Sequence, residues 1–390
     1  MKLKTLAAAA LFAAGMLPFA SQAQAPLTIG FITTLSTPAG YIGEDERDAF
    51  LLAVKEGGGK LGGVPVKLVI EDDGLKPATG KQIADKMVQD GIKLYTGINF
   101  SNVLTAVAPT VLAAGGFYVG LNAGPSAYAG KSCHPNYFTA AFQNDSFSDT
   151  AGMAANELGY KKVVILAPNY QAGRDALAGF KRAYKGQVLD EIYTKLDQSD
   201  FSVELARIRS LKPDAIFQFH PGGAGINLAK QYANSGLAAS VPMVTPIYSM
   251  DRRMLAAVGD AGKGYYLSAL WSADLNNAEN KHFVDAFQKA YGRLPTDYAA
   301  QSYDTANLIA SALKAVGGDV AGKPDAFRDV LRKADFKSLR GKFKFAKNQH
   351  PIQDWYLLHV EAGADGKLTY KTVKTIAKDH TDVYGSECKM

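Results

Sequence analysis

The stretch FQFHPGGAGINLAKQ (residues 217–231) joins an apolar, strand-like run to an amphipathic run through His220, Pro221 and two glycines. Glycine-rich loops between a strand and a helix often bind phosphate, because their backbone N–H groups approach the anion closely. A Walker loop requires Gly-Lys followed by Ser or Thr, and neither this stretch nor GGGKLGG (57–63) contains that sequence. The sequence therefore does not favour nucleotide binding.

Metal and nucleophile chemistry also lack their usual patterns. The six histidines show no HxxxH or HxH spacing, and the two cysteines are far apart, so we expect no metal site and no cofactor. No G-x-S-x-G occurs, and Ser126 in NAGPSAYAG lacks the second glycine of a nucleophile elbow. We therefore expect a protein that is not an enzyme.

The loops after the expected strands are rich in glycine, hydroxyl, amide and aromatic groups and poor in acids. Such loops hold a ligand by hydrogen bonding and stacking. His220 ends a strand, where open α/β sheets present ligand-facing loops, so we expect it to line a pocket.

The elements that position these loops alternate along the chain. LTIGFIT (27–33) and VPVKLVIEDD (64–73) are typical of strands, and Phe50, Leu51 and Val54 share one face of the helix expected between them. A second series of alternating elements begins near residue 146, without a low-complexity linker. This pattern predicts an α/β fold of two lobes, each with a parallel-sheet core, joined by short hinge crossings.

The N-terminus is typical of an exported protein. Lys2 and Lys4 precede an apolar run (5–20) and Ala23-Gln24-Ala25, so residues 1–25 are predicted to be a cleaved signal peptide. A membrane anchor is the alternative, but the apolar run is short and no later run reaches 18 apolar residues. We expect an exported protein that does not insert into the membrane.

Charge and cysteine usage agree with export. The formal charge of +6 is dispersed without a basic block, so no nucleic-acid partner is expected. Cys133 and Cys388 are the only cysteines, and in an oxidising compartment an even pair most simply forms a disulfide. Two unrelated thiols remain the alternative.

Several segments, in order, resemble the periplasmic solute-binding proteins of branched-chain-amino-acid-type ABC importers. The resemblance covers nearly the whole mature chain and rests on TIGFITTLSTPAGYIGEDERDAFLLAV, GGVPVKLVIEDDGLKP, GINFSNVLTAVAP, NAGPS, VVILAPNYQAGRDALAGFK, DFSVELARIRSLKPDAIF and KQYANSGL. It implies a monomer of two Rossmann-like lobes that close on a small molecule and pass it to an inner-membrane permease. The implied lobes are 26–143 plus 272–346 and 144–271 plus 347–390, with crossings near 141–146, 268–275 and 346–352.

The resemblance also implies a set of ligand-binding positions. Ser101 in GINFSN stands where the family's serine binds the ligand carboxylate. The family's ligand-binding loops of the second lobe align with NYQAGRD and with the stretch at residues 217–231. The full expected set is Tyr41, Phe100, Ser101, Asn102, Asn122, Ala123, Gly124, Tyr170, Arg174, Phe219, His220 and Tyr248, with Trp271 as a further aromatic candidate.

One departure from the family bears on the ligand. The amino-acid-binding members have an acid that binds the ligand's amine, whereas the corresponding TPIY (245–248) has Ile247 there. Burying an ammonium group without a partner costs several kcal/mol. Unless Asp251 or Asp274 reaches the site, the sequence favours an aromatic carboxylate of the benzoate or hydroxycinnamate type. The alternatives are a branched-chain amino acid or amide on the same fold, a sensory ligand-binding module, and an exported α/β enzyme.

Overall fold

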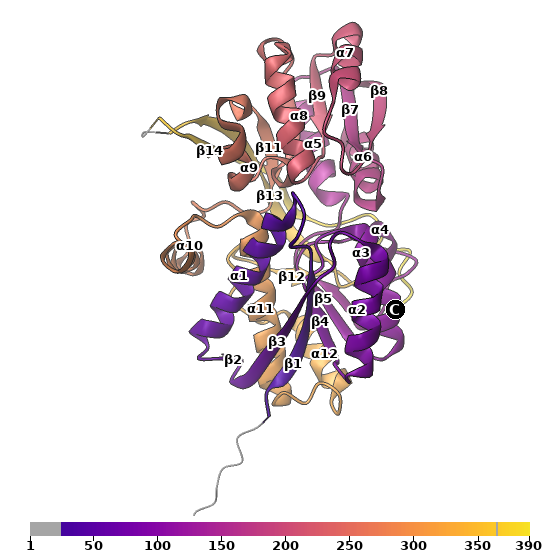
Figure 1. The fold of residues 1–390 in the computed structure, drawn as a ribbon, viewed down its shortest axis with the longest axis vertical. Helices are drawn as coiled ribbons and strands as arrows, with labels where there is room; N and C mark the ends of the chain where they lie inside the picture. The colour runs from indigo at the N-terminus through magenta and orange to yellow at the C-terminus, as the bar shows by residue number, and fades with distance from the viewer. Residues whose placement is uncertain (1–24, 364–365) are drawn as a thin grey trace, which may run out of the picture.

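The computed structural model describes residues 25–363 and 366–390. The expected signal peptide, residues 1–25, lies outside the described residues apart from Ala25. None of the helices in these two ranges is long and apolar enough to cross a membrane. Figure 1 shows two lobes, one above the other, each built on its own sheet.

The first sheet has six strands in the order β2-β3-β1-β4-β5-β6, and every neighbouring pair is parallel except β2 and β3. Ile29 and Phe31 on β1 have no exposed surface, which explains the continuous apolar run of a strand covered on both faces. The strands are β1 (Leu27–Thr33), β2 (Lys60–Leu61), β3 (Val64–Asp72), β4 (Leu94–Thr96), β5 (Phe117–Gly120) and β6 (Tyr137–Thr139).

Helices from two separate parts of the chain cover this sheet. The longest, α11, begins after Thr296, whose hydroxyl accepts a hydrogen bond from the Ala299 N–H at 3.3 Å, and it packs against α1. The first-lobe helices are α1 (Gly40–Glu56), α2 (Pro77–Gln89), α3 (Ser101–Ala113), α4 (Ser126–Ala129), α10 (Ala278–Tyr291), α11 (Asp297–Val316) and α12 (Pro324–Lys333).

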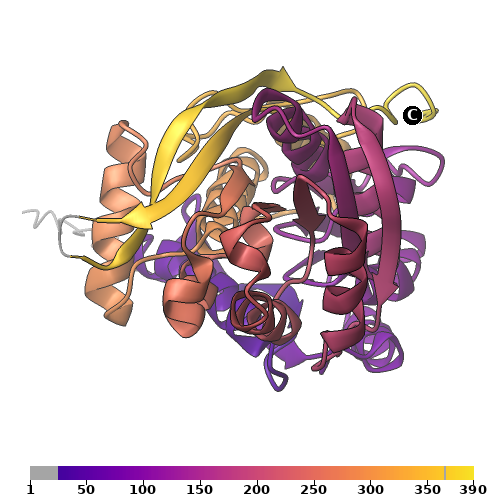
Figure 2. The same ribbon diagram turned by 90° about the horizontal axis from the view of Figure 1, so that it is seen from above.

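The second sheet has eight strands. β7 to β11 pair in parallel, β13 is antiparallel to β11 and to β12, and β14 pairs with β13 in a long hairpin that Figure 2 shows along one side of the lobe. The strands are β7 (Lys162–Pro168), β8 (Gln187–Thr194), β9 (Ala215–Gln218), β10 (Met243–Pro246), β11 (Tyr266–Ala269), β12 (Lys344–Phe345), β13 (Pro351–Ala362) and β14 (Leu368–His380).

The helices of the second lobe follow these strands in the order that the sequence predicts. The predicted α/β fold with two parallel-dominated sheets is therefore confirmed. The helices are α5 (Ser146–Glu157), α6 (Gln171–Ala183), α7 (Ser202–Leu211), α8 (Gly223–Asn234) and α9 (Arg252–Val258), with 3₁₀ turns η1 (Leu237–Ala239), η2 (Ile247–Ser249) and η3 (Gly259–Gly262).

Three segments connect the lobes: residues 140–145 between β6 and α5, 270–277 between β11 and α10, and 334–343 between α12 and β12, since β12 already pairs with β13 in the second sheet. The C-terminal tail makes a further passage, which the implied lobe bounds omit although the expected Cys133–Cys388 disulfide requires it. After β14, assigned by sequence to the second lobe, the chain returns to the first lobe, where Cys388 forms a disulfide with Cys133 at a Cα–Cα distance of 5.6 Å. Figure 1 places the C-terminus beside this lobe.

Candidate ligand-binding site between the lobes

A narrow cavity of about 20 Å³ lies where the loops of the two lobes meet. This volume is far below the range for small-molecule sites, so a ligand enters only after the lobes or the lining side chains move apart. None of its 15 lining residues is acidic or basic. The cavity therefore suits a small ligand that is held by neutral groups.

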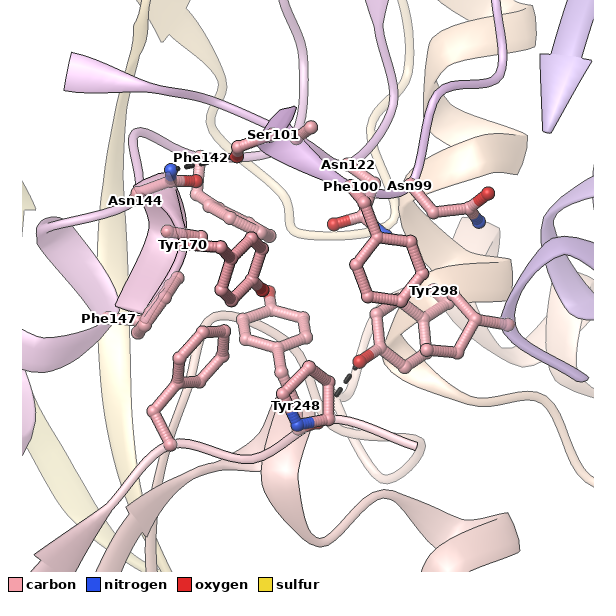
Figure 3. Close-up of a pocket in the computed structure, with 15 residues that line it drawn as sticks. Asn99, Phe100, Ser101, Asn122, Phe142, Asn144, Phe147, Tyr170, Tyr248 and Tyr298 are labelled. Atoms are coloured by element: carbon pink, nitrogen blue, oxygen red, sulfur yellow. Dashed lines mark hydrogen bonds between the residues drawn. The ribbon is translucent and has the colours of Figure 1, made fainter. Parts of the chain in front are cut away.

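Seven of the 15 residues that line the cavity are aromatic (Figure 3). Phe100 of the first lobe faces Tyr170 of the second, with ring centroids 6.3 Å apart, and Tyr170 stacks on Phe219 at 6.4 Å with an interplanar angle of 12°. Such rings favour a flat apolar ligand body. The aromatic lining residues are Phe100, Phe142, Phe147, Tyr170, Phe219, Tyr248 and Tyr298.

Ser101 is the hydroxyl at the polar end of the cavity. It begins α3, whose N-cap residue Phe100 provides no side-chain hydrogen bond, so the first N–H groups of the helix need another acceptor. Ser101 Oγ accepts a hydrogen bond from Asn144 Nδ2 at 3.0 Å, which leaves the hydroxyl proton of Ser101 for a ligand. A helix N-terminus with a hydroxyl donor suits a carboxylate.

Two further amides border the cavity. Asn99 and Asn122 each donate from Nδ2 to the Glu46 carboxyl group, at 2.5 and 2.7 Å. Burial raises the pKa of Glu46 well above its ordinary value, which favours the neutral acid. The carboxyl group behind these amides is therefore less readily ionised than one in water.

Contacts between the lobes surround the cavity. The Tyr41 hydroxyl donates to Asp251 Oδ2 at 2.6 Å, and Arg253 on α9 forms an ion pair with Glu44 on α1 at 3.0 Å. On another side, the Ser126 hydroxyl of the first lobe donates to Asp175 Oδ1 of the second at 2.8 Å. These contacts hold the two lobes against each other.

The glycines of the opening stretch meet the other lobe. A Cβ atom at Gly222 would lie 2.7 Å from Cβ of Ala39, and one at Gly223 would lie 2.8 Å from Cβ of Pro38. Gly222 also has a φ of 69°, which favours glycine. Pro221 lines the cavity, but the two glycines serve the close approach of the lobes.

The structure brings together seven of the twelve residues expected at the site. These seven line the cavity: Phe100, Ser101, Asn122, Ala123, Tyr170, Phe219 and Tyr248. The remaining five do not line it, and four of these are Tyr41, Asn102, Gly124 and Arg174. Tyr41 contacts Asp251, and Asn102 lies next to Ser101 on α3. Arg174 is exposed and donates to Asn169 and Gln171. Gly124 lies behind the lining, where its N–H donates to Asn144 Oδ1 at 3.1 Å and a Cβ atom would lie 2.0 Å from the Phe142 carbonyl oxygen.

His220 lies outside the cavity lining, contrary to the expectation from its position at a strand end. Its ring is fully buried and bonds to Thr194 Oγ1 at 2.9 Å and to Gln218 Oε1 at 3.0 Å. Burial lowers the pKa of His220 to about 3. The ring is therefore neutral and is part of the second lobe's own packing.

The acids that were considered as amine partners also lie outside the lining. Asp251 accepts from the N–H groups of Arg253 and Met254 as the N-cap of α9, in addition to its bond with Tyr41. Asp274 accepts from Ser272 Oγ at 2.5 Å, and Ile247 is fully buried. Trp271 is likewise buried outside the lining, and its indole N–H donates to Asn280.

Sequence reasoning missed eight lining residues. Phe142, Asn144 and Phe147 come from the first crossing and the start of α5, and their proximity to the cleft could have been inferred from the expected crossing at 141–146. Tyr298 lies on α11, a helix whose first ten residues are all buried, so periodicity gives no signal for it. The others are Ile42, Asn99, Ala172 and Pro221.

Residues 25–363 and 366–390 contain no group of three His, Cys, Asp or Glu side chains that could hold a metal ion.

Two α/β lobes, short crossings between them and a cavity at their junction define a bilobal ligand-binding protein. Residues 26–367 match the model of the periplasmic binding protein family, so the chain belongs to that family, as the resemblance in its sequence indicated.

Solved structures and curated relatives agree with this assignment. A solute-binding protein of an ABC transporter from R. palustris, in complex with benzoate, is 31% identical with a TM-score of 0.88, covering 94% of this chain and 100% of that one. A second, from Rhodopseudomonas palustris BisB5 with 3,4-dihydroxybenzoic acid, is 30% identical with a TM-score of 0.82, covering 91% and 98%. Leu/Ile/Val-binding protein homolog 6 of Brucella melitensis is 28% identical, covering 90% and 91%.

Proposed function

We propose that this protein is the periplasmic solute-binding component of an ABC importer and that it captures a small aromatic carboxylate between its lobes. The observation that carries the proposal is the composition of the cavity lining. It has seven aromatic residues, a serine hydroxyl at a helix N-terminus and no acidic residue. The ring of the ligand lies among the aromatic side chains, and its carboxylate accepts hydrogen bonds from Ser101 and the first N–H groups of α3.

The relatives support the class of ligand. Both R. palustris proteins at 30–31% identity bind benzoates, and the similarity extends over nearly the whole of each chain. The ligand is captured by hinge closure and passed to an inner-membrane permease. The protein acts as an exported monomer after cleavage of its leader, and it releases the ligand chemically unchanged.

A branched-chain amino acid is the second candidate, because the Brucella relatives carry the name Leu/Ile/Val-binding protein homolog. An amino acid would bring an ammonium group into a cavity without an acidic lining residue. The desolvation of that group costs several kcal/mol, equivalent to at least a hundredfold in affinity. The lining therefore favours the aromatic acid.

A thermal-shift panel of the mature protein tests the proposal. Benzoate, hydroxybenzoates and hydroxycinnamates are compared with leucine, isoleucine and valine, and benzamide is the neutral control for the carboxylate. A ligand at 100 times its dissociation constant stabilises the protein by about 2.7 kcal/mol. Stabilisation by the aromatic acids alone supports the proposal, and stabilisation by the amino acids alone rejects it.

A further inference from the structure

Asp175 is a buried carboxylate of the second lobe that reaches the first lobe. It lies on α6 with 5% of its surface exposed. Its oxygens accept four hydrogen bonds: from Ser126 N at 3.2 Å, Ser126 Oγ at 2.8 Å, Asn144 Nδ2 at 3.0 Å and Gln171 Nε2 at 2.9 Å. All four donors are neutral groups. The buried carboxylate of Asp175 is therefore stabilised only while these hydrogen bonds point toward its oxygens.

Asn144 connects Asp175 to the cavity. Its Oδ1 accepts from the Gly124 N–H at 3.1 Å, which holds one end of the amide and leaves the other end to Asp175 and Ser101. The Nδ2 group then donates to Asp175 Oδ2 and to Ser101 Oγ, both at 3.0 Å. Both amide protons are used, and Ser101 is held as an acceptor toward Asn144.

This arrangement determines what Ser101 offers a ligand. A hydroxyl that accepts a bond from Asn144 still has one proton to donate, and Ser101 lines the cavity. The hydroxyl proton is therefore free to point at a carboxylate. Without Asn144 in this orientation, the hydroxyl could rotate and present its lone pairs to the same anion.

The chain of bonds also crosses from one lobe to the other. Ser101 and Ser126 belong to the first lobe, Asn144 to a crossing segment, and Asp175 to the second lobe. Two of the four bonds of Asp175 come from Ser126, so separation of the lobes breaks them and exposes the carboxylate. The side chain of Asp175 thus links the contact between the lobes to the orientation of Asn144.

We propose that Asp175 is a positioning residue, which holds Asn144 so that Ser101 donates to the ligand carboxylate only when the lobes are in contact. The inference rests on the proposed function for the identity of the ligand. It predicts that Asp175 affects affinity through Ser101, although Asp175 does not line the cavity.

A double-mutant cycle with benzoate tests this inference by isothermal titration. Asp175→Ala removes both acceptor oxygens and leaves Asn144 Nδ2 without this partner, and we expect it to weaken benzoate binding by about tenfold or more. In the Ser101→Ala background the same change should cost less than about threefold, because the hydroxyl that it positions is gone. Equal fold-changes in the two backgrounds, or no change in either, would overturn the proposal.

Controls separate positioning from general damage. Asp197→Ala, at an exposed position of the same lobe, should leave the affinity unchanged. Ser126→Ala removes one bond to Asp175 and leaves Asn144 intact, so the cycle remains measurable if Asp175→Ala does not fold. It should weaken binding in the wild-type background and have less effect with Ser101→Ala, and additive losses would count against the proposal.

The cycle is also independent of the aromatic assignment. Wild-type binding of benzoate is the result that tests the proposed function. If the wild type binds leucine and not benzoate, the proposed function fails, and the same cycle with leucine, which also has a carboxylate, decides the role of Asp175.

Discussion

Gly223 of the second lobe lies against Pro38 of the first so closely that a Cβ atom on Gly223 would be 2.8 Å from Cβ of Pro38. Gly223 is the first residue of α8, and its φ lies outside the left-handed region, so alanine is compatible with its backbone. The three nearest atoms to that Cβ all belong to Pro38, on the opposite lobe. The glycine therefore matters for lobe contact and hardly for the fold of its own lobe.

Gly223→Ala should weaken ligand binding without destabilising the ligand-free protein. The added methyl group clashes only when the lobes meet, and alanine favours the helix by up to about 1 kcal/mol. We expect a several-fold to tenfold loss of affinity by titration, with an unchanged or higher melting temperature. Gly385→Ala, whose Cβ would lie 3.8 Å from its nearest neighbour, is the matched control.

The double variant Pro38→Gly/Gly223→Ala should recover much of the lost affinity, because it removes the Cβ atom that the alanine meets. A loss of affinity in Gly223→Ala that the double variant does not relieve would contradict the assignment of these residues to lobe contact.

Ser101→Ala should weaken binding of an aromatic carboxylate by about 1–3 kcal/mol, because the anion loses a hydrogen-bond donor in a buried site. Ser210→Ala, an exposed serine of the second lobe, is the control and should have no effect. Titration of both variants measures the difference. An unchanged affinity in Ser101→Ala would remove this hydroxyl from the site.

His220→Gln should lower stability and leave affinity nearly unchanged. The ring bonds to Thr194 and Gln218 inside the lobe, and loss of such buried bonds costs about 1–3 kcal/mol. Urea denaturation measures the loss, with the exposed His282→Gln as control. A large fall in affinity at unchanged stability would instead place His220 in the ligand site.

The stability of the protein should depend on the ionisation of Asp251. Burial raises the pKa of Asp251 to about 6, against about 4 in the unfolded chain. The folded protein therefore binds more protons between these values, and its free energy of unfolding falls as the pH rises from about 4 to 6.

Asp251→Asn should be more stable than the wild type at pH 7.5, by about 1–2 kcal/mol, with little difference at pH 4. Asparagine still caps α9 through Oδ1, and its Nδ2 donates to the Tyr41 oxygen in place of the bond that Asp251 accepts. Denaturation at both pH values measures the effect, and Asp274→Asn, at an exposed position, is the control. A variant less stable than the wild type at pH 7.5 would show that the charged form is favoured.

The disulfide should stabilise the protein through the tail. Cys133→Ser/Cys388→Ser is expected to lower the free energy of unfolding by about 2–5 kcal/mol, since it frees a tail that closes a loop of 255 residues. Mass spectrometry of unreduced protein checks the bond itself. Two free thiols in the mature protein would contradict the structure at this point.

Much of the fold could be predicted because local patterns and the tertiary structure agree. The run LTIGFIT forms β1 over the predicted residues, since a strand covered on both faces needs continuous apolar residues. The expected Cys133–Cys388 disulfide already places Cys388 beside the first lobe, because Cys133 lies within 26–143, but the lobe bounds taken from the resemblance left the whole tail in the second lobe.

The site was predicted where family motifs fix a position on a loop, as at Ser101 and Tyr170. It was not predicted where packing between distant segments decides. His220 has the sequence position of a pocket residue, yet Thr194 and Gln218 bind its ring. Tyr298 reaches the cavity from a helix almost wholly buried at its N-terminal half, where no periodic pattern distinguishes one face.

Isothermal titration of benzoate and of leucine into the mature protein tests the central claim most directly. The account predicts one benzoate bound per chain, with no binding of leucine at the same concentrations, because the cavity has aromatic walls and no acid for an amine. Tight binding of leucine without binding of benzoate would contradict it and would mean that another group in the closed protein holds the ligand's ammonium.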